Sequence, residues 1–120
     1  MNALVYTGSG VGYTVEERPV PTITSPTDVI VKVNKASICG TDLHILKGDV
    51  PTVEKGRILG HEGIGTIASA GSSVKSFKEG DKVIISAVSS CSMCSYCRRG
   101  MSGRCTGTSL FTFISCHSTS

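Results

Sequence analysis

The segment from Cys91 to Cys105 reads Cys-Ser-Met-Cys-Ser-Tyr-Cys-Arg-Arg-Gly-Met-Ser-Gly-Arg-Cys. Its first three cysteines recur at every third position, and the fourth follows after seven intervening residues. Zinc prefers four tetrahedral ligands, and Cys-x2-Cys units supply thiolates from tight turns at little cost in loop entropy. The spacing therefore predicts one structural zinc, bound by Cys91, Cys94, Cys97 and Cys105.

Two other chemistries fit a cysteine cluster less well. A bacterial ferredoxin run has three residues before its last cysteine and then a proline, whereas here seven residues intervene and Thr106 follows. Disulfides require an oxidising compartment, which nothing else in the chain indicates. Structural zinc is the favoured interpretation.

Length and composition limit what the chain can be. Its 120 residues are enough for one domain. Its net charge of +3 is modest. Residues 1–6 show no signal peptide, and no apolar run is long enough for a membrane helix. We expect a cytoplasmic protein with reduced thiols and no membrane association. Basic residues are interspersed with acidic ones, so no nucleic-acid partner is expected.

The hydrophobic pattern predicts short strands rather than long helices. Strands are expected at residues 2–6, 13–18, 29–34, 62–74 and 83–85, with one or two helical turns at residues 40–46. No strand alternates with a long amphipathic helix. The predicted fold is therefore mainly β, a small and partly open barrel.

Two glycine-rich stretches superficially resemble phosphate-binding loops. Neither Gly8–Gly12 nor Gly63–Ala68 is followed by a helical pattern, which such loops require. We interpret the first as a turn between strands. In the second, β-branched residues indicate a strand in which glycines allow close backbone approach.

A second possible ligand set consists of Cys39, His61 and Glu62. From spacing alone these residues are more simply a core thiol and two surface polar groups. The surrounding sequence strengthens the case for a metal site.

Three motifs together resemble the zinc-dependent medium-chain alcohol dehydrogenases. Gly60-His61-Glu62-Gly63-Ile64-Gly65, followed by Gly71 and Val74, resembles their zinc signature. Cys39-Gly40-Thr41-Asp42-Leu43-His44 resembles their catalytic-zinc loop, and the four later cysteines resemble their structural-zinc lobe. The resemblance covers residues 1–105. It implies a GroES-like β domain, and in the full-length family member a Rossmann domain that binds NAD or NADP.

The resemblance assigns roles to individual residues. Cys39 and His61 correspond to ligands of the catalytic zinc, with Glu62 a ligand or a close neighbour that exchanges with substrate or water. Asp42 corresponds to a carboxylate that orients a ligating histidine. Without the resemblance, Asp42 is only an acidic residue favoured in the first turn of a helix.

Two further residues correspond to a proton path. Thr41 resembles the hydroxyl that takes the proton of the alcohol, and His44 resembles a histidine farther along the relay. On physical grounds alone, Thr41 is a helix cap and His44 an exposed polar residue. Gly40 replaces a basic residue found in some family members, so the chain more closely resembles the polyol, threonine and secondary-alcohol branches.

The sequence departs from the family after residue 105. Residues 106–120 include eight Ser or Thr and no Asp, Glu, Lys or Arg. We interpret them as a divergent tail on an incomplete catalytic domain that lacks the nucleotide-binding domain.

The expected function is zinc-assisted hydride transfer from a small alcohol or polyol to NAD(P). We expect this isolated chain to be inactive in that reaction. Two zinc sites are expected. Homo-oligomers form in the family but are not expected here. The alternative function is a non-catalytic zinc-binding interaction module.

Overall fold

The computed structural model describes residues 1–8, 10 and 12–107. Most of the predicted divergent tail lies outside this range. Within the described residues, no helix is both long enough and apolar enough to cross a membrane.

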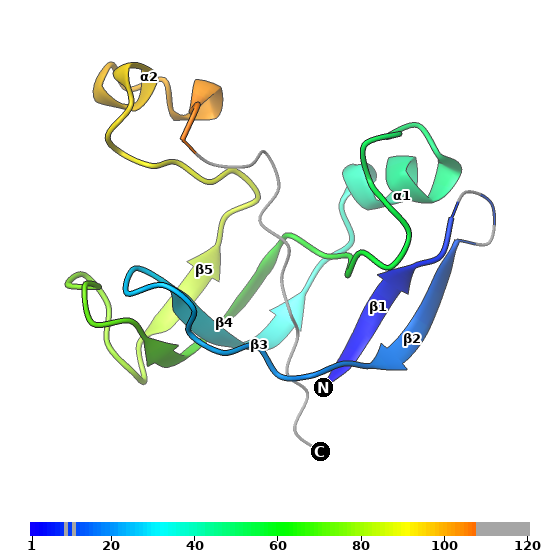
Figure 1. The fold of residues 1–120 in the computed structure, drawn as a ribbon, viewed down its shortest axis with the longest axis horizontal. Coiled ribbons are helices and arrows are strands. Elements are labelled where there is room, and N and C mark those ends of the chain that lie inside the picture. The colour runs from blue at the N-terminus through cyan, green and yellow to red at the C-terminus, as the bar shows by residue number, and fades with distance from the viewer. Residues whose placement is uncertain (9, 11, 108–120) are drawn as a thin grey trace.

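The described chain forms two small antiparallel sheets, shown in Figure 1. One sheet pairs β1 (Asn2–Tyr6) with β2 (Tyr13–Glu17), and the other has the order β3-β4-β5. The strands of the second sheet are β3 (Val29–Ala36), β4 (Gly63–Ala70) and β5 (Lys82–Ile85). The mainly β, open architecture predicted from the hydrophobic pattern is confirmed.

The predicted strand over residues 62–74 is shorter in the structure. β4 ends at Ala70 because the next residue, Gly71, packs against the backbone of Pro26 and its N–H donates to Asp28 O at 2.8 Å. A turn follows, closed by the Val74 N–H donating to Gly71 O at 3.0 Å. The predicted strand is therefore too long, because it includes this turn up to Val74.

A glycine in the middle of β4 permits close strand packing. Gly65 is buried opposite Val33, and a Cβ there would overlap the backbone oxygen of Lys32. The predicted role of a glycine at a close backbone approach is confirmed at this position.

The core lies between β1 and the helix α1 (Gly40–Lys47). Tyr6, Ile45 and Leu59 form its buried apolar cluster. β1 has a second neighbour besides β2, because the Leu59 N–H donates to Leu4 O and the Tyr6 N–H to Arg57 O, both at 2.8 Å. The segment 57–59 therefore extends this small sheet, and it leads directly to His61.

Helix α1 has defined ends. Cys39, in an extended conformation, is its N-cap, and Gly48 ends it at φ 89°, a left-handed conformation that glycine adopts without strain. The Gly48 N–H donates to Ile45 O at 2.9 Å, which satisfies a carbonyl of the last turn. The helical turns predicted for residues 40–46 thus form, one residue longer.

The four-cysteine segment forms a separate lobe beyond β5. It contains the short helix α2 (Ser95–Arg98) and the 3-10 helix η1 (Ser102–Arg104), neither of which has a buried residue. Figure 1 shows the lobe standing away from both sheets. Packing against the rest of the domain therefore contributes little to its order.

Candidate metal centres

The four cysteines of the lobe converge as predicted from their spacing. One ligand atom from each of Cys91, Cys94, Cys97 and Cys105 lies within 4.8 Å of all the others. Zn–S bonds of about 2.3 Å in a tetrahedron place the sulfurs about 3.8 Å apart, which is compatible with a cluster whose ligand atoms all lie within 4.8 Å of one another. The donor set fits a structural zinc.

Backbone N–H groups surround the sulfurs. Cys91 N–H donates to Cys105 Sγ and Cys94 N–H to Cys91 Sγ, each at 3.3 Å. Cys97 N–H donates to Cys94 Sγ at 3.5 Å, and Gly107 N–H to Cys105 Sγ at 3.3 Å. These donors stabilise negative charge on sulfur, which four thiolates around one zinc require.

The thiols do not titrate alike. Backbone N–H groups of Cys97 and Thr106 lower the pKa of Cys94 to about 5. Desolvation, together with the neighbouring Cys94 sulfur, raises the pKa of Cys97 to about 12. The N–H donors around Cys94 therefore favour a thiolate there, and thiolate is the form of cysteine that binds zinc.

The structure also brings the second predicted set together. Ligand atoms of Cys39, His61 and Glu62 all lie within 4.8 Å of one another. Cys39 begins α1, whereas His61 and Glu62 immediately precede β4, so the fold joins two distant segments. His61 is only 2% exposed, and this mixed S, N and O set fits Zn²⁺.

Asp42 contacts both sides of this cluster. Its Oδ2 accepts a hydrogen bond from the Cys39 N–H at 2.9 Å, and its Oδ1 lies 3.3 Å from His61 Nδ1. The carboxylate is buried, at 7% exposure. The contact is within ion-pair distance, and a carboxylate at Nδ1 generally favours the tautomer that carries its proton there.

The two residues predicted for a proton path lie in different surroundings. The Cys39 thiol lies 3.8 Å from Thr41 Oγ1, so the Thr41 hydroxyl borders the cluster. His44 lies at the surface with Nδ1 2.8 Å from Asp49 Oδ2, and these side chains are 61% and 54% exposed. Their roles in proton transfer stay predictions.

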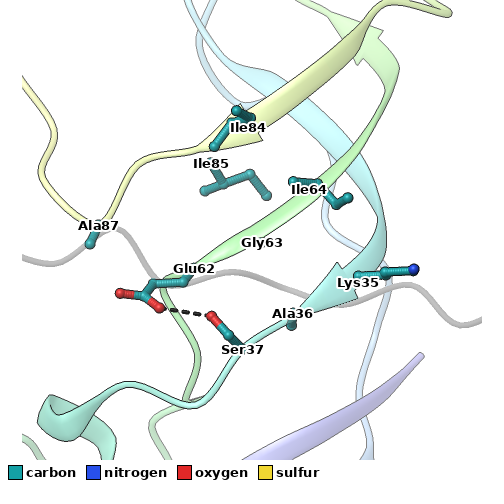
Figure 2. Close-up of a pocket in the computed structure, with 9 residues that line it drawn as sticks. All are labelled: Lys35, Ala36, Ser37, Glu62, Gly63, Ile64, Ile84, Ile85 and Ala87. Atoms are coloured by element: carbon teal, nitrogen blue, oxygen red, sulfur yellow. Dashed lines mark hydrogen bonds between the residues drawn. The ribbon is translucent and has the colours of Figure 1, made fainter.

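The sequence analysis missed Ser37. Its hydroxyl donates to Glu62 Oε2 at 2.8 Å, and Figure 2 shows the two side chains pointing toward each other. Hydrogen bonds from Ser37 and then from Cys39 hold the pKa of Glu62 below its ordinary value. Only the register of β3 against β4 would have indicated that Ser37 lies beside Glu62, and the sequence alone does not reveal that register.

Ser37 and Glu62 also line a pocket of about 450 Å³ at the end of the three-stranded sheet. Its other lining residues are mostly apolar: Lys35, Ala36, Gly63, Ile64, Ile84, Ile85 and Ala87. Figure 2 shows the isoleucines on β4 and β5 beside the Glu62–Ser37 pair. Glu62 therefore connects the cluster to a mostly apolar pocket.

Comparisons with known proteins agree with this geometry. The family model of the alcohol dehydrogenase GroES-like domain matches residues 25–118, a range that extends beyond the boundary expected at residue 105. A zinc-type alcohol dehydrogenase-like protein of Schizosaccharomyces pombe is 45% identical over 100 residues, covering 82% of this chain and 23% of the relative. L-threonine 3-dehydrogenase of Mesorhizobium japonicum is 40% identical over 111 residues, 90% of this chain and 32% of that enzyme.

A solved structure gives the same result. The zinc-dependent alcohol dehydrogenase 2 from Streptococcus pneumonia, in its apo form, superposes with a TM-score of 0.88 at 44% identity. The match covers 98% of this chain and 33% of that one. This chain spans between 23% and 33% of the length of these three proteins.

These matches place the fold of this chain in the class of GroES-like β domains. The chain belongs to the alcohol dehydrogenase GroES-like domain family, and it corresponds to part of the catalytic domain of the zinc-type alcohol dehydrogenases. The resemblance inferred from the three sequence motifs is confirmed.

Proposed function

We propose that this chain supplies the zinc-binding half of the active site of an NAD(P)-dependent dehydrogenase that oxidises a small alcohol or polyol. The observation that carries the proposal is the cluster of Cys39, His61 and Glu62 with Asp42 in contact with two of its members. A zinc bound there acts as a Lewis acid that lowers the pKa of a bound hydroxyl group.

The residues around the cluster have separate tasks. Cys39 and His61 bind the metal, and Asp42 fixes the position of the Cys39 backbone and the tautomer of His61. Glu62 supplies a third ligand or exchanges with substrate. The Thr41 hydroxyl beside the cluster accepts the proton of the alcohol, and His44 continues the path toward solvent.

A second zinc in the four-cysteine lobe is structural, because all four of its ligands come from the protein and no position remains for substrate. The alternative function, a non-catalytic interaction module, needs only this lobe. The buried His61 and the Asp42 contact are not required for that alternative, so they support the enzyme.

Native mass spectrometry of the chain, refolded with zinc under reducing conditions, tests the two sites by counting metals. We expect two zincs, with Cys39→Ser removing one and Cys94→Ser removing the other. If the wild-type chain binds only one zinc, and this zinc persists in Cys39→Ser but is lost in Cys94→Ser, the proposed active site is contradicted.

Activity is tested in a chimera. Residues 1–105 replace the equivalent segment of the Streptococcus pneumonia enzyme, which is 44% identical to this chain. We expect zinc-dependent alcohol oxidation by the chimera, abolished by Cys39→Ser, and no NAD-dependent oxidation by the isolated 120-residue chain. A chimera that folds and binds zinc but oxidises no alcohol would refute the proposed reaction.

A further inference from the structure

Ser37 and Glu62 lie directly opposite each other at the end of a strand pair. The pairing of β3 with β4 ends at Ala36 and Gly63, and the next residues along this antiparallel ladder are Ser37 and Glu62. The ladder continues to them, because the Ser37 N–H donates to Glu62 O at 3.4 Å. Directly opposed residues project from the same face with their Cβ atoms about 5 Å apart.

This position allows the two side chains to meet. The Ser37 hydroxyl donates to Glu62 Oε2 at 2.8 Å, a short distance typical of a charge-assisted hydrogen bond. An ionised carboxylate has two oxygens and about four acceptor positions. One hydrogen bond to Oε2 therefore leaves the carboxylate able to bind a metal.

The bond from Ser37 matters because it is the stronger of two hydrogen bonds that lower the pKa of the Glu62 carboxylate, the other coming from Cys39. A glutamate side chain has several rotatable bonds and loses considerable entropy when it is fixed. Glu62 is half-buried and borders an open pocket lined mainly by apolar side chains. The Ser37 hydroxyl holds the carboxylate together with Cys39, and one carboxylate oxygen lies within 4.8 Å of the ligand atoms of Cys39 and His61.

We propose that Ser37 is a positioning residue for the second metal cluster, holding the Glu62 carboxylate within reach of a metal bound by Cys39 and His61. This inference rests on the proposed function of that cluster and adds a residue that the sequence motifs do not include. Loss of a group that orients a metal ligand typically weakens binding by about 10- to 100-fold. Because Ser37 is exposed and water competes for Glu62, we expect the lower end, about tenfold.

The test is a Co²⁺ titration of the full 120-residue chain whose four-cysteine lobe is already loaded with zinc. Visible absorption reports Co²⁺ at the Cys39 cluster and gives a dissociation constant without any measurement of activity. We expect Ser37→Ala to raise this constant about tenfold. Ser37→Thr keeps the hydroxyl in a residue type suited to extended backbone, and we expect it to bind like the wild type.

A double-mutant comparison separates positioning from a general structural effect. If Ser37 acts through Glu62, then Ser37→Ala has no further effect in a Glu62→Ala background. An equal loss in both backgrounds, or wild-type affinity in Ser37→Ala, would overturn the role of Ser37. Circular dichroism verifies that each variant folds, and rescue by Ser37→Thr provides a second check.

The result also distinguishes this inference from the proposed function. A wild-type chain that, with zinc in its lobe, binds no Co²⁺ would refute the metal site, and the positioning role would fail with it. A wild type that binds Co²⁺, together with an unaffected Ser37→Ala, would refute only the positioning role.

Discussion

His61 Nδ1 lies 3.3 Å from Asp42 Oδ1, and both side chains are buried. The other oxygen of the same carboxylate accepts a hydrogen bond from the Cys39 N–H at 2.9 Å. Asp42 thus connects two candidate ligands that lie on different segments of the chain. One side chain contacts both the residue at the start of helix α1 and the imidazole of His61.

The first prediction concerns this carboxylate. Asp42→Asn keeps an oxygen for the Cys39 N–H but can place an N–H group toward His61, which favours the tautomer with its proton on Nε2. We expect metal affinity at the cluster to fall by about 10- to 100-fold. The measurement is the Co²⁺ titration described above.

Asp49→Asn is the matched control for this prediction. Asp49 pairs with His44 at 2.8 Å, but both side chains are more than half exposed, so little stability or affinity depends on them. Equal losses in the two variants would show that the contact between Asp42 and His61 has no special role.

The second prediction concerns the packing of β4. Gly65→Ala introduces a Cβ that overlaps the backbone oxygen of Lys32 and lies 2.6 Å from a methyl carbon of Val31. We expect the free energy of unfolding to fall by about 1–3 kcal/mol, measured by urea denaturation of the zinc-loaded chain. Gly103→Ala is the control, since no neighbouring atom lies within 4 Å of its added Cβ. Equal stability of the two variants would contradict the close approach.

The third prediction concerns removal of metal from the lobe. Neither α2 nor η1 has a buried residue, so a bound ion supplies most of the order in this segment. We expect chelation to abolish amide-exchange protection across residues 91–105 while β3 and β4 remain protected. Hydrogen–deuterium exchange of the chelated chain measures this, and Cys94→Ser should reproduce the result without a chelator. A metal-free lobe that stays protected would refute the prediction.

The fourth prediction is a dependence of stability on pH. Asp28 Oδ2 accepts hydrogen bonds from the Ser25 N–H at 2.8 Å and from the Thr24 hydroxyl at 2.9 Å, and these bonds lower the pKa of Asp28. A lowered pKa in the folded state contributes stability above the unfolded pKa of about 3.9, which is lost as the pH falls through the folded value.

Asp28→Asn should therefore lower the Tm at pH 6 and reduce the loss of Tm between pH 6 and pH 3. Thermal scans in the presence of a chelator keep metal release out of this comparison. Glu79→Gln removes a charge of the same sign from an exposed turn and serves as the control. An Asp28→Asn variant with the wild-type acid dependence would contradict the contribution of this turn.

The sequence predicts the local features of this molecule well and its cross-strand features poorly. Four cysteines at short spacing identify the lobe because two residues separate each of the first three ligands and only seven precede the fourth. Helix α1 is predictable from its own residues and from Gly48 at its end. In contrast, Cys39 and His61 meet only through tertiary folding, and spacing alone left them as separate residues.

The missed contact of Ser37 with Glu62 has the same physical origin. It depends on the register of β3 against β4, which includes irregularities between Ile30 and Val31 and between Val33 and Lys35. A shift of one residue would move Ser37 away from Glu62. No local pattern in the sequence encodes those irregularities.

The pairing of β1 with residues on both sides has a consequence for how the protein folds. The partner strand β2 follows almost at once, but Val5 also forms a bridge with Ile58, about fifty residues later in the chain. During synthesis the first strand can form its hairpin early, yet one edge stays open until residues 57–59 leave the ribosome. Such non-local pairing slows folding, and we expect completion of this edge to coincide with the arrival of His61 beside Cys39.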